Sequence, residues 1–424
     1  MVKSGYKQTE VGVIPEDWEV DTIGSVCTSV AIGGNYQNST IPSDFPLIKM
    51  GNLSRGSITL EKVEYIRAAI PDQKDLLHYG DVLFNARNTP ELVGKVAIWR
   101  DELPKAYYNS NLLRFIFDLE KADPFYMNLA LNTKETISSF RNIAKGTTSV
   151  AAIYPQDLLR VLIPIPPITE QKRIAEALSD MDKLISSLEK LIEKKKAIKQ
   201  GAMQELLTGK RRLPGFSGEW NTARFGDLFV ICPNNAFTRD QLTIGGKIKN
   251  IHYGDILTKY GEYLDGSSAS IPTLEKSLTT KKYPDNAFVQ SGDVIVADTA
   301  EDLTVGKAVE IVNVCGKMLS GQHTFLCRPI IPFAPMYLGY YMNSADFHDQ
   351  IIPFVTGTKV SSISKASLCS LIICYPETPE QETIAEVLAN IDNSIVALQI
   401  KLLKAQKIKQ GMMQQLLTGK VRLG

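Results

Sequence analysis

One long stretch occurs twice in this chain, and the repeat limits the folds that the chain can adopt. Residues 164–213 read PIPPITEQKRIAEALSDMDKLISSLEKLIEKKKAIKQGAMQELLTGKRRL, and about half of these positions recur in 374–424. Gln171 matches Gln381, which lies 210 residues further on, and the later matches keep this offset. A constant offset over such a length indicates an internal duplication.

Both copies predict a long helix with a coiled-coil seam. Their apolar residues recur at alternating steps of four and three, the heptad spacing of helices that pack along one edge. Pro164–Pro167 marks the start of the first helix, because proline cannot continue one, and Gly209 and Gly419 suit C-terminal caps. One such helix alone would be interpreted as a solvated amphipathic helix, but two matching copies favour a coiled-coil pair. The predicted seam residues are Ile174, Leu178, Met181, Ile185, Leu188, Ile192, Ile384, Leu388, Ile391, Ile395, Leu398 and Leu402.

The composition is that of an ordinary soluble protein with little net charge. Hydrophobic residues make up 44% of the 424 residues, and the formal net charge is +1, much less than a dedicated DNA-coating protein carries. Any nucleic-acid role must therefore rely on local patches or on partners that supply positive surface. No apolar run is long enough to cross a bilayer, and the six cysteines form no CxxC pair. We therefore expect a cytoplasmic protein with reduced thiols and no membrane contact.

The sequence outside the helices is duplicated as well. Trp18 and Trp220 are each followed by five residues and a glycine, and the triplet Gly-Asp-Val at 80–82 recurs at 292–294. The whole chain therefore predicts a tandem duplication of a globular domain plus a long helix, with the two helices antiparallel and related by pseudo-twofold symmetry. The expected divisions are 1–165 and 214–375 for the two globular domains, and 166–213 and 376–424 for the two helices.

Each globular domain is expected to be α+β and mainly β. Short apolar runs such as GDVLFNA and GKAVEIV, bounded by turn residues, predict strands, but their order is left open between a curved sheet and a barrel. Helical segments are predicted at 124–142 and 334–352. The sequence that would continue the chain beyond Leu423 matches Ile14–Trp18, so the two ends of the chain are expected to lie close together.

The polar loops differ most between the two halves. Residues 31–45, AIGGNYQNSTIPSDF, have no close counterpart in the second half, which suits a duplicated recognition module whose halves read different targets. In base reading, Arg and Lys suit guanine, Asn and Gln suit adenine, and acidic side chains accept from cytosine. The candidates in the first half are Asn35, Gln37, Lys49, Asn52, Arg87 and Asn88, and those in the second are Lys249, Asn250, His252, Tyr253, Asp298, Glu301 and His323.

Two Gly-Thr turns, one in each half, supply candidates for phosphate contact. The residues around them are Lys145, Thr147 and Thr148, and Thr358 and Lys359. Phosphate contact and simple turn chemistry are both open for these positions. For every candidate in the polar loops, the alternative is an ordinary solvated loop residue.

No catalytic motif is recognised. The only Pro-Pro, Pro166–Pro167, precedes a helix and is not the Asn/Asp-Pro-Pro-aromatic loop of an adenine methyltransferase. Gly306–Lys307 lacks the spacing of a phosphate-binding loop. Asp285, Asp293 and Asp298 are weak nuclease candidates, and the four histidines show no metal-ligand spacing. The sequence therefore favours a non-catalytic chain that holds no metal and no cofactor.

Several motifs occur in one order along the chain. TEVGVIPEDWEV lies near the start, GDVLFNARNTPELVGKVAI follows, EQ-x2-IAE-x-L occurs at Gln171 and Gln381, and each helix ends in KQG-x-MQ-x-LLTGK. In this order and duplication the chain resembles the specificity subunit of a Type I restriction–modification enzyme. The resemblance covers essentially the whole sequence, although no single motif is very specific.

The resemblance implies a function and a set of partners. It implies two target recognition domains that each read one half of a bipartite site on double-stranded DNA. It also implies spacer helices that set the gap and dock two modification (methyltransferase) subunits, with restriction subunits as further partners. S-adenosylmethionine, ATP and Mg are then expected only in the partner subunits. One departure matters: Arg87 stands where the second half has Thr299, so contact roles cannot be copied between halves.

Two other functions are kept as alternatives. One is a DNA methyltransferase or nuclease with an unfamiliar motif, and the other is a scaffold that binds only proteins. For the preferred interpretation, the helix expected from Gln171 to Leu207 would span about 56 Å at 1.5 Å per residue. That length corresponds to an upper bound of roughly 16 base pairs between half-site centres.

Overall fold

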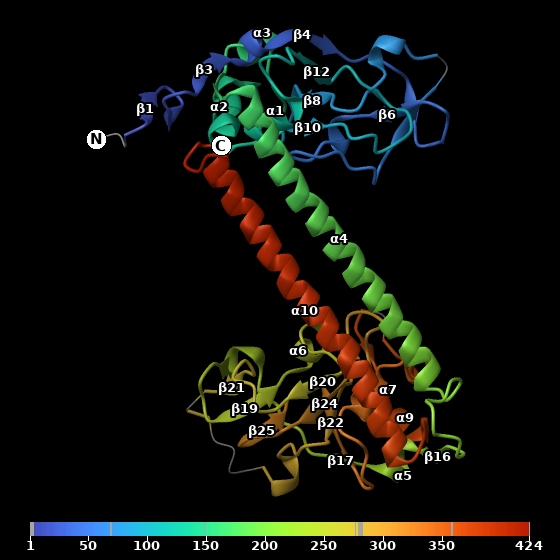
Figure 1. Cartoon of the computed structure of the whole chain (residues 1–424). Helices are drawn as coiled ribbons and strands as arrows, with labels where there is room; N and C mark the ends of the chain where they lie inside the picture. Colours follow the sequence, from blue (N-terminus) through green and yellow to red (C-terminus); the bar gives the residue numbers. More distant parts are fainter. Residues whose placement is uncertain are drawn as a thin grey trace. The chain divides into compact units, whose positions relative to one another are not determined.

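Two long helices of equal length organise the fold. α4 (Ile168–Leu206) and α10 (Thr378–Leu416) have 39 residues each, and their bounds keep the 210-residue offset of the sequence repeat (Figure 1). α4 begins directly after Pro167, as the sequence predicts. Gly209 and Gly419 follow the helices with φ of +69° and +67°. This is the left-handed conformation of a glycine C-cap, so the predicted caps are confirmed.

The computed structural model describes residues 4–67, 70–147, 149–275, 277–278, 283–357 and 359–423. The chain forms two compact units, of which the first contains Met1–Leu188 and Lys401–Gly424 and the second contains Glu189–Ile400. Each unit therefore combines one globular part with a piece of both long helices.

The first unit is built on two sheets. Its larger, antiparallel sheet has the strand order β10 (Val96–Ile98), β8 (Val82–Asn85), β12 (Leu112–Phe117) and β4 (Cys27–Ile32). The smaller sheet has the order β11 (Tyr107–Tyr108), β6 (Pro46–Ile48), β7 (Glu64–Ile66) and β5 (Asn38–Ser39), with β11 and β6 parallel. Leu83 and Leu112 of the larger sheet pack with Ile48 and Tyr108 of the smaller one, so the two sheets share a buried layer.

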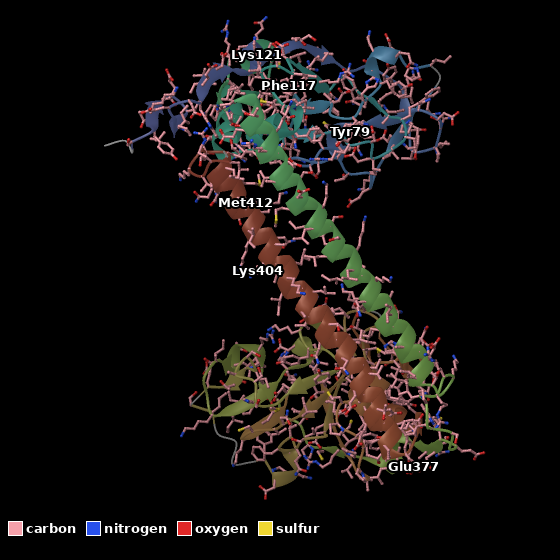
Figure 2. The ribbon with its side chains drawn as sticks, viewed as in Figure 1. Tyr79, Phe117, Lys121, Glu377, Lys404 and Met412 are labelled. Atoms are coloured by element: carbon pink, nitrogen blue, oxygen red, sulfur yellow. The ribbon has the colours of Figure 1, made fainter. Side chains whose placement is uncertain are left out.

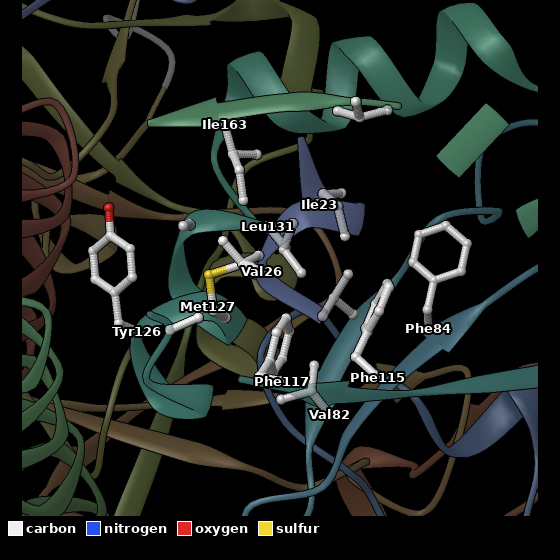
Figure 3. Close-up of a cluster of buried hydrophobic side chains, with 14 of the residues drawn as sticks. Ile23, Val26, Val82, Phe84, Phe115, Phe117, Tyr126, Met127, Leu131 and Ile163 are labelled. Carbon is white, nitrogen blue, oxygen red and sulfur yellow. The ribbon is translucent and has the colours of Figure 1, made fainter. Parts of the chain in front are cut away.

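Two helices cover the other face of the larger sheet. They are α1 (Pro124–Ala130) and α2 (Lys134–Ile143), in the segment that the sequence predicts to be helical. The rings of Phe84 and Phe140 meet edge to face at 5.2 Å, which fixes α2 against β8. Tyr126 of α1 belongs to the same buried cluster (Figure 3). Alternate residues of one strand thus face the helices and the second sheet.

The second unit repeats this architecture with one more strand. Its larger sheet has the order β17 (Phe229–Cys232), β26 (Thr324–Pro329), β22 (Val294–Ala297), β24 (Ala308–Val312) and β20 (Tyr263–Asp265). The smaller sheet has the order β18 (Leu242–Thr243), β21 (Thr273–Leu274), β19 (Ile248–Ile251) and β25 (Lys317–Ser320). α7 (Tyr337–Met342) and α8 (Ala345–Ile351) occupy the second predicted helical segment. The mainly β, α+β fold of each half is confirmed, with two packed sheets in place of a single curved one.

Short strand pairs join each globular part to its helix. β15 pairs with β3 and leads into α4, and β28 pairs with β16 and leads into α10. The bounds of these strands are Leu162–Ile165, Glu19–Thr22, Ile372–Tyr375 and Asn221–Arg224. The remaining α-helices are α3 (Pro155–Leu158), α5 (Phe225–Leu228), α6 (Tyr253–Thr258) and α9 (Lys365–Ser370). An N-terminal hairpin is formed by β1 (Tyr6–Thr9) and β2 (Gly12–Pro15).

The repeated Gly-Asp-Val triplets have a structural role. Asp81 accepts a bond from Arg114 at 3.0 Å, and Asp293 is held at both oxygens by Arg328, at 2.9 and 2.7 Å. Asp293 is buried, so its charge needs this partner. The aspartates of the repeat therefore stabilise the larger sheets, and the weak nuclease interpretation of Asp293 is not needed.

The repeated Glu-Gln pairs fix the starts of the long helices. The Gln171 side chain accepts from the Asp123 N–H at 2.8 Å and donates to the Pro166 carbonyl at 2.9 Å. Gln381 makes the matching bonds, accepting from the Ala334 N–H and donating to Pro376. Each helix start is thereby bound to the globular part that precedes it.

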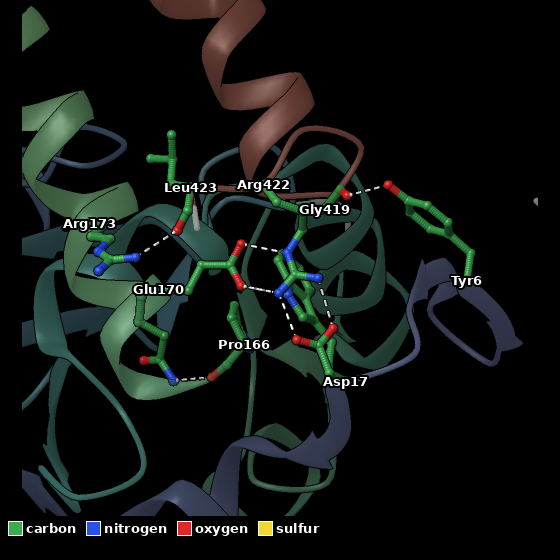
Figure 4. A network of polar contacts seen from close by, with 10 residues as sticks. Tyr6, Asp17, Pro166, Glu170, Arg173, Gly419, Arg422 and Leu423 are labelled. Carbon is green, nitrogen blue, oxygen red and sulfur yellow. Dashed lines mark hydrogen bonds and ion pairs between the residues drawn. The ribbon is translucent and has the colours of Figure 1, made fainter. Parts of the chain in front are cut away.

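A buried carboxylate holds the end of the chain in the first unit. Glu170 receives two bonds from Arg422, both at 2.7 Å, and a third from the Trp18 indole at 3.0 Å (Figure 4). Arg422 also binds Asp17, and this bond holds the pKa of Asp17 below its usual value. The Tyr6 hydroxyl donates to the Gly419 carbonyl at 3.0 Å, so the expected closeness of the two ends is confirmed.

The second unit contains the same junction within the chain. Glu380, at the start of α10, receives two bonds of 2.5 Å from Arg212, which follows the end of α4. The Arg212 guanidinium also lies 5.8 Å from the ring of Trp220. The side chain of Glu380 is only 3% exposed, so its charge depends on Arg212.

The helices run antiparallel inside each unit. In the first unit, Arg173 bonds Leu423 and Asp182 pairs with Lys409. The residue numbers therefore increase along one helix in the direction in which they decrease along the other. In the second, Lys199 pairs with Asp392. The predicted seam residues lie between the two helices and fall into two groups by burial. Ile174, Leu178, Ile192, Ile384, Leu388 and Ile395 are buried, whereas Met181, Ile185, Leu188, Ile391, Leu398 and Leu402 are half-buried.

One buried carboxylate makes the second unit sensitive to pH. Glu310 of β24 is 1% exposed and accepts from the N–H groups of Met336 and Gly339, at 2.7 and 2.9 Å, where α7 begins. Burial raises the pKa of Glu310 from 4.5 to about 7, although the two N–H bonds oppose the shift. Because the folded state holds the proton more tightly, this group stabilises the fold below pH 4.5 and loses that contribution as the pH rises to about 7.

The substitution Glu310→Gln should remove this pH dependence. We expect the variant to be less stable, because its single amide oxygen cannot accept from both N–H groups in place of two carboxylate oxygens. Its unfolding free energy should, however, depend less on pH than that of the wild-type chain. Relative to the variant, the wild-type chain should lose up to about 3 kcal/mol of unfolding free energy between pH 4.5 and 7. Urea unfolding across that range measures both proteins. A constant difference between them at every pH would contradict the assignment.

Candidate nucleic-acid interface

Three loops meet at the ends of matching strands in each unit. In the first unit, the Asn109 N–H bonds the Ile48 carbonyl at 3.2 Å, and the Ala86 N–H bonds the Asn111 carbonyl at 3.2 Å. In the second unit, Gly321 bonds Ile251 at 2.8 Å and Asp298 bonds His323 at 3.2 Å in the same pattern. We call this place the loop junction. It comprises Lys49–Met50, Ala86–Arg87 and Ser110–Asn111 in the first unit, and His252–Tyr253, Asp298–Thr299 and Gln322–His323 in the second.

The matched bonds relate the two junctions residue by residue. Lys49 occupies the position of His252, and Asn111 occupies that of His323. Arg87 occupies the position of Thr299, as the sequence comparison indicated. The same main-chain bonds therefore occur in both units, although His323 has a left-handed backbone and Asn111 does not. The side chains at these positions differ in size, charge and hydrogen-bonding capacity.

A small sheet lies beside the first junction. β9 (Arg87–Asn88) pairs with β14 (Ala151–Ala152), which pairs with β13 (Lys145–Gly146). Lys145 pairs with Asp157 at 2.6 Å and is mostly exposed, and Thr147 forms the turn that follows. The sheet brings the predicted Arg87, Asn88, Lys145 and Thr147 into one structure. Thr148 lies outside the described residues.

The second unit has a smaller version of this sheet. β23 (Thr299–Ala300) pairs with β27 (Ser361–Ser362), next to the second Gly-Thr turn. Gly357 there has φ of +108°, and a Cβ on it would collide with the Val360 carbonyl, so the turn requires glycine. Lys359 is exposed, and the predicted Thr358 lies outside the described residues.

Aromatic side chains gather at the second junction. The Tyr253 ring packs on His252 at 4.7 Å and meets the ring of His323 edge on at 5.5 Å. His323 Nδ1 lies 3.6 Å from Asp298 Oδ1, and the backbone of His323 has a left-handed φ of +57°. Such a conformation in a non-glycine residue costs free energy and marks a constrained position. The structure thus brings together four residues that the sequence proposed separately.

The protonation state of His252 follows from its surroundings. Burial, together with the nearby Arg239 guanidinium, holds the pKa of His252 below 6.5. Its Nδ1 accepts the Gly254 N–H at 3.0 Å, so the neutral ring carries its proton on Nε2. His252 is therefore fixed as a hydrogen-bond donor at neutral pH.

Two cations at this junction were missed by the sequence analysis. Arg239 and Lys259 both pair with the buried Asp255, each at 2.8 Å, while their own side chains are 50% and 57% exposed. Neither belongs to a repeated motif, and only the fold places them beside α6. Asn111 of the first unit is likewise not among the predicted residues, because it lies in a turn that matches no motif in the second half.

At the first junction, the charge of the lysine is neutralised by a nearby carboxylate. Lys49 is held by Glu64 at 3.0 Å and by the amide oxygen of Asn38 at 3.2 Å. Arg87 is exposed, and the side chain of Asn88 accepts from the Thr89 N–H. Of these residues, Arg87 presents the most accessible group for recognising a base edge or a phosphate.

Three candidates have their side chains turned into the fold. Asn52 is buried, with its amide bonded to the Lys49 N–H and the Thr59 carbonyl. Asn250 is fully buried against Asn235, and the Lys249 ammonium bonds the Gly266 carbonyl at 2.5 Å. These three side chains are used in bonds within the fold, so they do not belong to the proposed contact set.

The other candidates lie on exposed loops. Asn35 and Gln37 precede β5, and Glu301 follows β23. Among the described residues, no group of three or more His, Cys, Asp or Glu side chains is placed to hold a metal ion. Within the same part of the chain, no helix combines the length and the apolar character needed to cross a membrane.

Comparison with known proteins defines the class of this chain. The family model of the Type I restriction modification DNA specificity domain matches residues 15–200 and again residues 217–406. Two copies thus cover most of the chain and coincide with its internal repeat. The chain belongs to this family, which confirms the resemblance seen in the sequence. It is a specificity subunit of a type I restriction–modification system.

Individual relatives agree with the family assignment. A candidate specificity subunit of the MjaX type I restriction enzyme from Methanocaldococcus jannaschii is 27% identical over 99% of this chain and 97% of that protein. The MjaVIII specificity subunit of the same organism is 24% identical over 99% of this chain and 97% of that protein. The crystal structure of the type I system S subunit from M. genitalium has a TM-score of 0.57 at 14% identity, covering 94% of this chain and 96% of that one. This likeness shows a shared fold.

The strained backbone of His323 generates a prediction about function and stability. Because glycine adopts positive φ without strain, His323→Gly should leave the unfolding free energy unchanged or raise it by up to about 1 kcal/mol. The same change removes the imidazole, so it should weaken DNA binding by the assembled complex. Urea unfolding and fluorescence anisotropy measure the two effects.

The control makes the same backbone change elsewhere. Asn313 has φ of +52° on an exposed turn outside the loop junction. Asn313→Gly should therefore leave DNA binding unchanged. If both variants bind DNA like the wild-type chain, His323 has no part in recognition.

Proposed function

We propose that the two units of this specificity subunit read the two halves of a bipartite site on double-stranded DNA. The observation that carries the proposal is the loop junction, where the same pattern of main-chain bonds holds different side chains in the two units. Two similar frameworks with different side chains are suited to reading two different sequences. A scaffold that binds only proteins would not need this arrangement.

The side chains at the junctions have the chemistry of base recognition. Arg87 can contact guanine through two parallel hydrogen bonds, and Asn111 can do the same with adenine. In the second unit, the Asp298 carboxylate can accept from cytosine, while His252 is fixed as a donor. The proposed contact set is Arg87, Asn88, Lys49, Asn111, Asn35, Gln37, His252, Tyr253, Asp298, Glu301 and His323, with phosphate contacts from Lys145, Thr147, Lys359, Arg239 and Lys259.

The long helices are proposed to set the unread gap. At 39 residues and 1.5 Å per residue each helix spans about 58 Å, the length of roughly 17 base pairs of B-DNA. This is an upper bound for the distance between half-site centres, because globular parts overlap the helix ends. The observed helices are two residues longer than the 37 residues from Gln171 to Leu207.

The helices are also proposed to dock two modification subunits. In the second unit, apolar residues at helical spacing are 41–62% exposed on their outer sides: Leu191, Ile198, Val396 and Ile400. In the first unit, Leu403 is 59% exposed beside the exposed Lys404 (Figure 2). Exposed apolar side chains in this number are a feature of surfaces that partner helices cover.

The chain itself is proposed to be non-catalytic. In this proposal S-adenosylmethionine, ATP and Mg bind only to the partner subunits, and restriction subunits join the modification complex in the cytoplasm. The family assignment supports this division of labour, because a specificity subunit supplies recognition to enzymes that act on the same DNA. Incubating the purified chain with DNA and S-adenosylmethionine, without partners, tests the proposal, and methyl transfer would refute it.

The first test of divided recognition is Arg87→Ala. We expect recognition of one half-site to weaken by about 1–3 kcal/mol if Arg87 makes a bidentate guanine contact, with the other half-site unaffected. Thr299→Ala, at the equivalent position of the second unit, should affect only the other half-site. Binding to duplexes with single substitutions along the site measures both. Equal losses at both half-sites would exclude separate reading.

The second test lengthens the helices. One heptad inserted after Leu188 and one after Leu398 keep both seams in phase and add about 10 Å. The preferred gap should then lengthen by up to about three base pairs, while both half-sites keep their sequence. Methylome sequencing of cells that carry the variant gives the new site. An unchanged gap would show that the helices are not the ruler.

A further inference from the structure

A compact ion cluster connects the second globular part to both long helices. Lys199 of α4 pairs with Glu262 at 2.7 Å and with Asp392 of α10 at 2.8 Å. The Lys199 side chain is 15% exposed, and each carboxylate is 22% exposed. One ammonium group therefore bridges two helices and the loop that leads into β20.

Aromatic groups complete this cluster from the globular part. The Tyr340 hydroxyl of α7 donates to the second oxygen of Asp392 at 2.6 Å, and the Lys199 ammonium lies 5.4 Å from the Tyr340 ring. Tyr263 of β20 packs edge on against Tyr340 at 6.0 Å. The Glu262 carbonyl also accepts the Glu310 N–H at 3.0 Å, which ties the cluster to the central sheet. Two separate elements of the globular part thus hold the helices.

The first unit has the equivalent helix residues but not this connection. Lys409 and Asp182 lie 210 residues from Lys199 and Asp392, and they form the same helix-to-helix ion pair. Among the described residues of that unit, Lys409 makes no ion pair with the globular part. The position of Tyr340, three residues after the repeated tyrosine, is Leu129 in the first half. Among the described residues of the first unit, the place of β20 is taken by a single parallel bridge between Gly56 and Ala97 of β10 and not by a strand.

The surroundings leave room for movement if the cluster is broken. A cleft of about 580 Å³ lies beside it, lined by Lys199, Glu262, Asn343, His348 and Asp392. A packed core would resist reorientation even without the ion pairs, but a cleft offers little resistance. At this point the polar bonds restrain the angle between these helices and the globular part, in addition to the apolar cluster that Ile384 and Leu388 share with α7.

We propose that Lys199, Glu262, Asp392 and Tyr340 form an anchor that fixes how the second recognition domain is oriented on the helices, so that its half-site is accepted at one gap length. These are positioning residues, since none belongs to the loop junction. The inference rests on the proposed function, and it assigns the anchor to one domain only. The first domain lacks this connection, and its polar contacts with the helices lie near the helix ends, around Glu170 and Gln171.

The anchor is tested with duplexes whose gap varies in steps of one base pair. Three variants of the full chain, assembled with modification subunits, remove one partner each: Lys199→Met, Glu262→Gln and Tyr340→Phe. We expect discrimination between the preferred gap and gaps one base pair longer or shorter to fall by about tenfold or more. Sequence preference within both half-sites should stay unchanged, because the reading residues are intact.

The matched control is Lys409→Met in the first unit. It removes the equivalent charge from the helix pair without releasing a globular part, so the gap profile should keep the wild-type shape. Loss of discrimination in this variant, equal to that of Lys199→Met, would overturn the proposal. If Lys199→Met fails to fold, Glu262→Gln carries the test, since it keeps the side-chain volume. A folded Glu262→Gln chain with an unchanged gap profile would also overturn it.

The outcomes separate this inference from the proposed function. A wild-type complex without any gap preference would refute the ruler itself. If the preferred gap lengthens in the heptad variant, while all three anchor variants still discriminate between gap lengths like the wild-type chain, only the anchor is refuted. A broadened gap in the anchor variants, with both half-sites still read, is the result that we expect.

Discussion

The fold depends on a buried carboxylate at the start of each long helix. Glu170 and Glu380 each bind an arginine that follows the end of the other helix, Arg422 and Arg212 respectively. Removing the arginine of such a pair leaves the buried carboxylate without its charged partner, which destabilises the fold. The bond sets the longitudinal register of the two helices inside each unit. The Trp18 indole also donates to Glu170, so the N-terminal part of the first unit is bound to the same carboxylate.

The sequence predicted what is periodic and local. The 210-residue offset gave both helices because heptad spacing, proline and glycine act over a few residues. The sequence did not predict the contact residues reliably, because the burial of a side chain depends on segments that are far away in the sequence. Asn52 and Asn250 have the right chemistry but lie inside the fold, whereas Asn111 is identified only by a main-chain bond to Ala86. The strand order, and the extra strand β20, also depend on pairings between segments far apart in sequence.

The two halves solve the same physical problems with different groups. Asp123 caps α1 from the adjacent position, whereas α7 is capped by Glu310 from a neighbouring strand. Lys49 is neutralised by Glu64 at one junction, while at the other Asp255 forms ion pairs with two exposed cations. The second unit therefore carries more buried charge. Its stability should therefore respond more strongly to pH than that of the first unit.

The main-chain bonds at the loop junction have an evolutionary consequence. The bonds between Ala86 and Asn111, and between Asp298 and His323, are made by N–H and carbonyl groups that every residue except proline provides. Side chains at these positions can therefore be exchanged without loss of the bonds that shape the loops. A new target could therefore be acquired by a few substitutions that leave these main-chain bonds in place. Recognition can thus diversify quickly on a scaffold that hardly changes.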